Sequence, residues 1–133
     1  MADDKAVPIR SDVDIVTSRQ IGRDLARQLG FSPTDLTLIA TAISELARNL
    51  VVYARGGMIH LEIIRDGDRM GIQITATDTG PGIPDLNLAM RGGYSTSGSL
   101  GLGLPGVRRL MDEMDIQSEM GKGTTVKAKK WKR

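Results

Sequence analysis

The stretch Asp78-Thr79-Gly80-Pro81-Gly82-Ile83 follows a segment in which apolar and polar residues alternate. The side chains of a strand repeat every two residues, so Asp78 falls on the same inward face as the two isoleucines and the alanine of residues 72–76. A carboxylate on that face is costly unless something pairs with it. Gly80 and Gly82 allow backbone angles that other residues avoid and let a ligand approach closely. The combination predicts a pocket that reads a hydrogen-bond donor; the alternative is a surface turn that begins with aspartate.

The composition is that of an ordinary soluble domain. With 133 residues, 40% hydrophobic and 26% charged, the chain is long enough for one domain with one core. The lack of cysteine excludes disulfides, thiolate metal sites and a cysteine nucleophile, and the single histidine excludes a histidine-rich metal site. A formal net charge of +2 gives no reason to expect nucleic acid as a partner. We see no run of about 20 apolar residues and no signal peptide, so we expect a cytoplasmic protein that does not bind membranes.

Two helices are predicted in the first half of the chain. A mobile tail at residues 1–6 and a short strand at 7–10 precede a helix over 12–29, which Gly30 ends. Ser11 or Asp12 is its cap, and its expected apolar side consists of Ile15, Val16, Ile21, Leu25 and Leu29. The second helix begins at Ser32-Pro33-Thr34-Asp35, which combines a capping serine, a proline in the first turn and an acid near the positive end.

The second helix is expected to reach about Ala54 and to carry two rows of apolar side chains. One stripe consists of Leu36, Ile39, Ile43, Leu46, Leu50 and Ala54, and the other of Leu38, Ala42, Glu45, Asn49 and Val52. Glu45 and Asn49 are therefore polar residues in a largely apolar row, one turn apart and on the same side. They are either half-solvated border residues or a pair of functional groups.

The second half of the chain is predicted to hold strands, a long loop and a further helix. Residues 58–64 alternate, with His60 outward and therefore no ligand, and a hairpin turn at 66–69 leads into the strand that delivers Asp78. Residues 85–100 contain a short helix at 85–91 and a glycine- and hydroxyl-rich loop. A loop of this length in a small domain is either a mobile lid or a disordered connection.

The last part of the chain is predicted to hold a helix and a strand. Gly101-Leu102-Gly103-Leu104-Pro105-Gly106 opens the helix, whose apolar side would consist of Val107, Leu110, Met111 and Met114. A glycine-rich loop at a helix N-terminus leaves free backbone amides that suit phosphate, although no G-K-[ST] follows as in a P-loop. Residues 124–131 are expected to form an edge strand that its lysines protect from aggregation.

Four motifs occur in a fixed order along the chain. They are Glu45-x-x-x-Asn49 on a helix, Asp78-x-Gly80-x-Gly82 after a strand, Gly101-x-Gly103 before a helix and Gly123-Thr124-Thr125 at the start of a strand. Their order and spacing resemble the Bergerat-type ATP-binding fold of the GHKL superfamily, which histidine kinases, Hsp90, type II topoisomerases and MutL share. Within that superfamily, residues 43–49, 92–98 and 101–113 look like the RsbT-type serine/threonine switch kinases of the bacterial stress-signalling complex called the stressosome.

The resemblance implies an α/β (α+β) two-layer sandwich, with helices on one face of a mixed, mostly antiparallel sheet. It implies one domain over residues 1–133, with residues 85–100 as the ATP lid. ATP and Mg²⁺ would be bound, Asn49 would be the Mg²⁺ ligand, and Glu45 would accept the proton of the incoming hydroxyl. Asp78 would accept a hydrogen bond from the adenine amino group, which disfavours guanine. The other nucleotide-binding residues would be Gly80, Gly82, Ile83, Gly101, Leu102, Gly103, Leu104, and Thr124 or Thr125; Arg48, Arg55 and Arg91 are alternatives for neutralising phosphate.

The implied function is transfer of the ATP γ-phosphate to a serine or threonine of a partner protein. The resemblance implies STAS-domain scaffold and antagonist proteins as substrates, and a PP2C-type phosphatase that the released kinase binds and activates. Two alternatives stay open: an anti-sigma factor kinase of the RsbW or SpoIIAB type, and an ATP-sensing interaction module without phosphotransfer. A sensor histidine kinase is not favoured, because too few residues precede the first helix for a phosphoacceptor hairpin.

Overall fold

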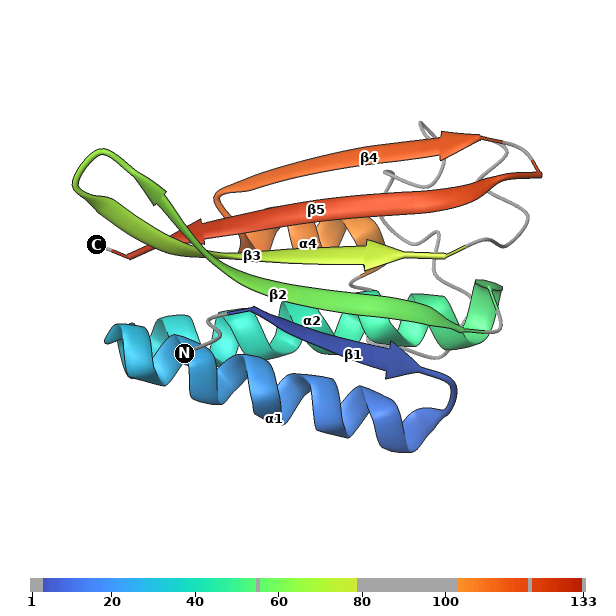
Figure 1. Cartoon of the computed structure of the whole chain (residues 1–133), viewed down its shortest axis with the longest axis horizontal. Helices are drawn as coiled ribbons and strands as arrows, with labels where there is room; N and C mark the ends of the chain where they lie inside the picture. The colour runs from blue at the N-terminus through green and yellow to red at the C-terminus, as the bar shows by residue number, and fades with distance from the viewer. Residues whose placement is uncertain (1–3, 55, 79–102, 120, 133) are drawn as a thin grey trace.

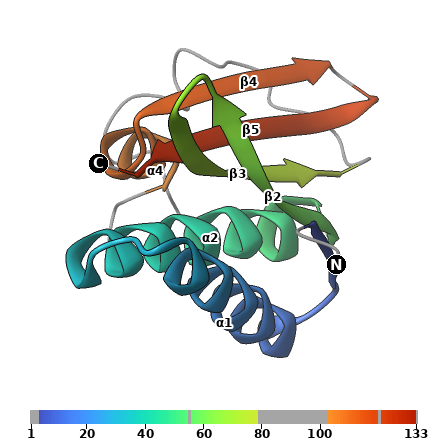
Figure 2. The ribbon, with the colours of Figure 1, turned by 60° about the vertical axis from the view of Figure 1, so that its left-hand side comes forward.

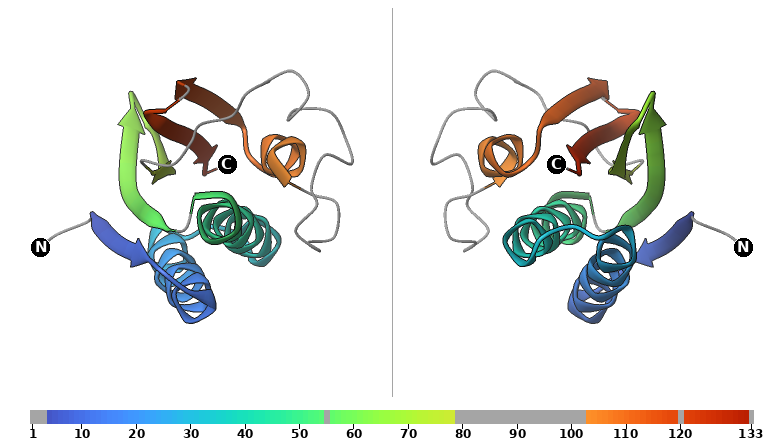
Figure 3. Two further views of the ribbon diagram at one scale, coloured as in Figure 1. Left: turned by 90° about the vertical axis from the view of Figure 1, so that its right-hand side faces the viewer. Right: turned by 90° about the vertical axis from the view of Figure 1, so that its left-hand side faces the viewer.

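The computed structural model describes residues 4–54, 56–78, 103–119 and 121–132. It contains strands β1 (Lys5–Ile9), β2 (Gly57–Asp66), β3 (Arg69–Thr77), β4 (Glu113–Glu119) and β5 (Gly123–Trp131), and helices α1 (Asp12–Leu29), α2 (Pro33–Ala54) and α4 (Gly103–Leu110). Within these ranges the strands form one sheet in the order β1-β2-β3-β5-β4, and all neighbours are antiparallel. The sheet is one layer (Figure 1), and seen end-on it curves around the helices on one face (Figure 3). The two-layer sandwich is confirmed, with an antiparallel rather than mixed sheet in the described part.

Local sequence signals determine the ends of α1. The backbone N–H of Arg10 donates to the Asp14 carboxylate at 2.8 Å, next to the extended Ser11 cap. Gly30 has a φ of 87°, which only glycine adopts readily, and its N–H donates to the carbonyl oxygen of Arg27. Val16 was expected on the apolar side but is 44% exposed, because the buried face runs along Ile15, Ser18, Gly22, Leu25 and Ala26.

Helix α2 begins as predicted, with the Asp35 N–H donating to Ser32 Oγ at 3.1 Å. By length and composition α2 could cross a membrane, which was not expected from the sequence. Half of its most apolar stretch is, however, buried inside the protein. Figure 2 shows α2 beside α1 under the sheet, and α2 packs against α1, α4 and strands β1, β2, β3 and β5. Its position at the centre of the domain accounts for the apolar composition.

The β2–β3 hairpin brings the apolar side chains of both strands to the inner face. Asp66 pairs with Arg69 at the predicted turn, and farther along Leu61 pairs with Ile74. Both of these core residues are completely buried. The predicted alternation, which placed Asp78 on the inward side, therefore agrees with the burial pattern of β3.

Three predicted boundaries or placements were wrong. Lys5 and Ala6, expected in a mobile tail, belong to β1, where they pair with Leu61 and His60. The helix expected to include Met114 ends at Leu110, because the next residues turn back onto the sheet: the Asp112 N–H donates to the carbonyl oxygen of Lys129 at 2.8 Å. Met114 lies instead in β4, a strand that was not predicted.

The strand β5 was expected at the edge of the sheet but lies inside it. It pairs with β3 on one side and with β4 on the other. Lys130 is accordingly 7% exposed and is not a solvated edge lysine. The strand β4 was missed although its burial alternates residue by residue from Glu113 to Glu119, with Met114 and Ile116 half-buried.

Candidate nucleotide-binding site

Asp78 lies directly after β3, on the inner side of the sheet. Its backbone N–H donates to the carbonyl oxygen of Thr124 at 3.0 Å, which extends the β3–β5 ladder by one step. Thr124 is 8% exposed, and because it lies two residues before Val126 its side chain is on the same inner face. Thr125 instead pairs with Thr77 and points to the other face. Of the two threonines that the sequence left open, Thr124 is therefore the neighbour of Asp78.

Ser118 on β4 is a neighbour of Thr124 that sequence reasoning missed. The two hydroxyl oxygens lie 2.8 Å apart and share a hydrogen bond. Ser118 is opposite Thr124 in the register of β4 and β5. The alternation of β4 could have revealed an inward Ser118, but only once residues 113–119 were recognised as a strand.

Glu45 lies in the interior, near the middle of α2. It is 7% exposed, and within the described part of the chain its Oε2 atom has no hydrogen-bond partner. A buried carboxylate oxygen without a partner is costly and needs an explanation, and a catalytic role is one such explanation. The half-solvated border position that sequence reasoning held open for Glu45 is wrong.

Asn49 lies one turn beyond Glu45, nearer the C-terminal end of α2, and is half-buried. The spacing of four residues puts both side chains on the same side of the helix. Val52, at the end of this row, is 45% exposed, so the row passes from the interior to solvent along α2. Asn49 therefore lies between the buried Glu45 and the exposed Val52.

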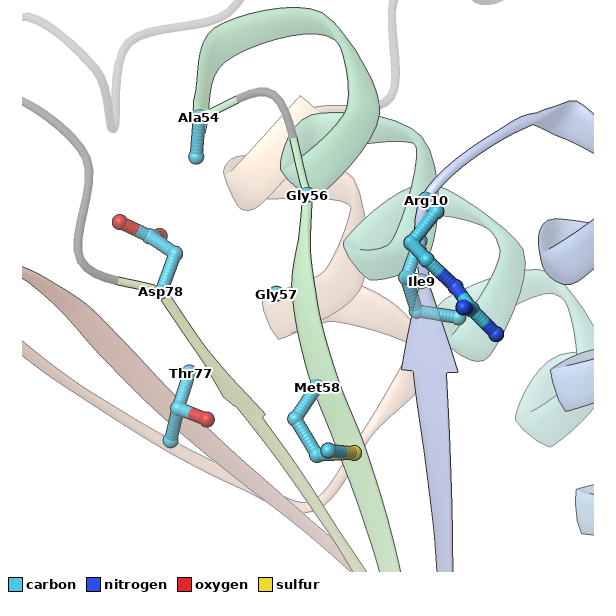
Figure 4. A pocket seen from close by; sticks show the side chains of 8 residues that line it. All are labelled: Ile9, Arg10, Ala54, Gly56, Gly57, Met58, Thr77 and Asp78. Carbon is cyan, nitrogen blue, oxygen red and sulfur yellow. The ribbon is translucent and has the colours of Figure 1, made fainter.

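A cavity of about 440 Å³ opens at the end of the sheet where β3 ends and Asp78 lies. It is lined by Ile9, Arg10, Ala54, Gly56, Gly57, Met58, Thr77 and Asp78. In Figure 4 the Asp78 carboxylate points toward the end of α2 at Ala54, whereas the Arg10 side chain extends away from it. The end of α2 and the end of β3 therefore line the same cavity, with the carboxylate between them.

Gly103 and Leu104, two of the predicted nucleotide-binding residues, lie at the N-terminal end of α4, and both are buried. Gly103 has a φ of 50°, which suits glycine at a tight helix start. Gly80, Gly82, Ile83, Gly101 and Leu102 lie outside the described residues, as do Arg55, Arg91 and the proposed lid at 85–100. Arg48 is half-buried on α2. In the described ranges, no group of three or more histidine, aspartate and glutamate residues is placed to hold a metal ion.

Comparison with known proteins identifies the family. The model of the histidine kinase-, DNA gyrase B- and HSP90-like ATPase family matches residues 34–132, which include all four motifs. The chain is also 51% identical over 133 residues to the serine/threonine-protein kinase RsbT of Bacillus subtilis (strain 168), covering 100% of both chains. The chain belongs to the RsbT family of serine/threonine-protein kinases. It is thus a serine/threonine kinase built on a GHKL-type ATPase domain, as the resemblance implied.

More distant relatives agree with this assignment. An anti-sigma F factor of Geobacillus stearothermophilus is 34% identical over 111 residues, covering 77% of this chain and 74% of the relative. The solved structure of the RsbU and RsbW domains of Rv1364c from Mycobacterium tuberculosis matches with a TM-score of 0.67 at 19% identity, over 97% of this chain and 32% of that one. The first supports a kinase of partner-switching systems, and the second supports the fold alone.

Proposed function

We propose that this RsbT-family kinase transfers the γ-phosphate of ATP to a serine or threonine of a STAS-domain partner protein, with Glu45 as the general base. The observation that carries the proposal is the buried Oε2 atom of Glu45, which lacks a partner within the described residues. An acceptor that is already desolvated and uncommitted is suited to receive a proton from an incoming hydroxyl.

The transfer step requires little covalent chemistry from the protein. The partner's hydroxyl oxygen bonds to the γ-phosphorus while the bond from that phosphorus to the bridging oxygen breaks and ADP leaves. The proton of the hydroxyl passes to Glu45. Asn49, one turn away on the same side of α2, would hold Mg²⁺ through its amide oxygen, together with phosphate oxygens. The ion would neutralise phosphate charge when bound.

Asp78 would select the base. Its carboxylate lies at the end of β3, beside the cavity and next to Thr124. A carboxylate accepts a hydrogen bond from the adenine amino group, but guanine presents a carbonyl at that place. Leaving a buried acceptor without its donor costs about 1–3 kcal/mol, so ATP would be preferred over GTP.

The family relationship supports a particular set of partner proteins. The full-length match to RsbT supports STAS-domain scaffold and antagonist proteins as substrates, and a PP2C-type phosphatase as the protein that the released kinase activates in the cytoplasm. Binding of a sigma factor is a second candidate function, which the 34% identity to an anti-sigma F factor favours. The higher identity to RsbT over the full chain makes the switch kinase the first choice.

Phosphotransfer to STAS-domain proteins encoded beside the gene tests the proposal. We expect intact-protein mass spectrometry to show the gain of one phosphate on a partner incubated with the kinase and Mg-ATP. Asn49→Ala and Glu45→Gln should abolish the gain, and Glu45→Gln should still bind ATP. Glu62→Gln, a change of the same kind at a half-buried residue of β2, should leave transfer intact. ATP binding without transfer to any STAS partner would contradict the proposed substrates and favour a role as an ATP-sensing module.

A further inference from the structure

We propose that Gly57, the first residue of β2, is a positioning residue that sets the place of the Asp78 carboxylate and thereby the preference for adenine. The inference rests on the proposed role of Asp78 as the adenine acceptor. Gly57 lines the same cavity as Asp78 and lies opposite the end of β3. It contacts no nucleotide in this proposal and acts only through Asp78.

The space at Gly57 is occupied by the residues that build the site. A methyl group added there would overlap the carbonyl oxygen of Thr77, the residue before Asp78. The same methyl group would lie 3.2 Å from Asp78 Cβ and 3.0 Å from Leu50 Cδ2. The carbonyl oxygen belongs to the backbone, so a side chain at position 57 can be accommodated only if the ends of β2 and β3 move apart.

Asp78 is held in place on its other side. Its backbone N–H donates to the carbonyl oxygen of Thr124 at 3.0 Å, so the end of β3 lies between β5 and Gly57. A shift of β3 away from β2 therefore presses its end against β5 and bends the ladder that presents the carboxylate. Hydrogen bonds weaken steeply with poor alignment, so a small displacement of Asp78 is enough to lose base selection.

Backbone conformation does not explain the glycine at position 57. Gly56, its neighbour, has a φ of 127°, and glycine is favoured there by conformation alone. Gly57 is not among the described glycines with positive φ. Close approach of Thr77 and Asp78 is therefore the reason that position 57 has no side chain.

Gly71 provides a matched control for the substitution. It lies in β3 near the hairpin, far along the strand from Asp78, and it likewise has no positive φ. A methyl group at Gly71 would lie 2.5 Å from the carbonyl oxygen of Lys130, a backbone clash of the same kind. Gly71→Ala should therefore disturb the sheet in a similar way without touching Asp78.

The test measures the ratio of the ATP and GTP dissociation constants for the full chain by calorimetry. This ratio does not depend on how much of a variant is folded, so it separates base selection from stability. We expect Gly57→Ala to lower the preference for ATP about tenfold, as a misplaced hydrogen bond would, and Gly71→Ala to keep the wild-type ratio. A wild-type ratio in Gly57→Ala would overturn the inference.

Asp78→Asn separates this inference from the function on which it rests. If Asp78→Asn keeps the wild-type ratio, the proposed role of Asp78 fails. If Asp78→Asn loses the preference and Gly57→Ala keeps it, only the role of Gly57 fails. Should Gly57→Ala not fold, the wild type and both glycine variants are compared in an osmolyte such as trimethylamine N-oxide, which favours the folded state; a wild-type ratio in Gly57→Ala there would also refute the inference.

Discussion

Lys130 Nζ on β5 donates a hydrogen bond to the carbonyl oxygen of Leu110, the last residue of α4, at 2.8 Å. The Asp35 carboxylate in the first turn of α2 lies 3.9 Å from the same Nζ. The last carbonyl groups of a helix have no partner within the helix, and a cation there is also favoured by the helix dipole. One buried lysine thus connects the sheet to the C-terminal end of α4 and approaches the start of α2.

Lys130→Met should loosen α4 from the sheet. The substitution keeps the apolar stem but leaves the Leu110 carbonyl without its donor, so we expect a loss of about 1–3 kcal/mol in the free energy of unfolding, measured in urea. α4 begins at Gly103, one of the proposed phosphate contacts, so ATP affinity should also fall. Lys129→Met, on the opposite face of β5, is the control. Equal losses in the two variants would show that the contact with Leu110 has no special role.

The buried position of Lys130 could not be predicted from local sequence patterns. The lysines near the chain end suggested an edge strand, because an edge is where lysine normally protects a sheet. The place of β5 inside the sheet depends instead on pairing with β3, which is distant in the sequence, and on the hairpin with β4, which was not recognised as a strand. Local patterns predicted α1, α2 and the β2–β3 hairpin because caps, turns and periodicity act within a few residues.

The hydrogen bond between Ser118 and Thr124 is expected to order the Thr124 hydroxyl beside Asp78. Ser118→Ala and Thr124→Val should each cost about 1 kcal/mol of stability, and the double variant should cost less than the sum because both remove one shared bond. Thr124→Val should also weaken ATP binding, and Thr125→Val, on the other face, should not. Additive losses in the double-mutant cycle would contradict a direct coupling.

As with the fold, the parts of the candidate site that depend on local patterns could be predicted, and the parts that depend on strand pairing could not. Glu45, Asn49 and Asp78 were predicted from the sequence because each interrupts a regular apolar pattern on a single element. Ser118 and Gly57 were not found, since their contacts with Thr124 and Thr77 arise from strand pairing. A glycine that is needed because neighbouring atoms fill the space has no side chain from which its role could be predicted.

The close packing of α1 on α2 leads to the last prediction. A methyl group at Gly22 of α1 would overlap Ile43 Cδ1 of α2 and would lie 3.5 Å from Leu61 Cδ1. Overpacking typically costs about 1–3 kcal/mol, and the better helix propensity of alanine returns about 1 kcal/mol. Gly22→Ala should therefore destabilise the protein by up to about 2 kcal/mol in urea unfolding, and ATP binding should be unchanged.

Ile43→Val removes the atom that the new methyl group would overlap. Alone it should cost about 0.5–1.5 kcal/mol, because it leaves a small void in the core. In Gly22→Ala/Ile43→Val the alanine methyl fills that void, so the double variant should be more stable than either single variant. This non-additivity distinguishes a direct contact from two independent defects. If the losses simply add, Gly22 and Ile43 do not share the space that the structure assigns to them.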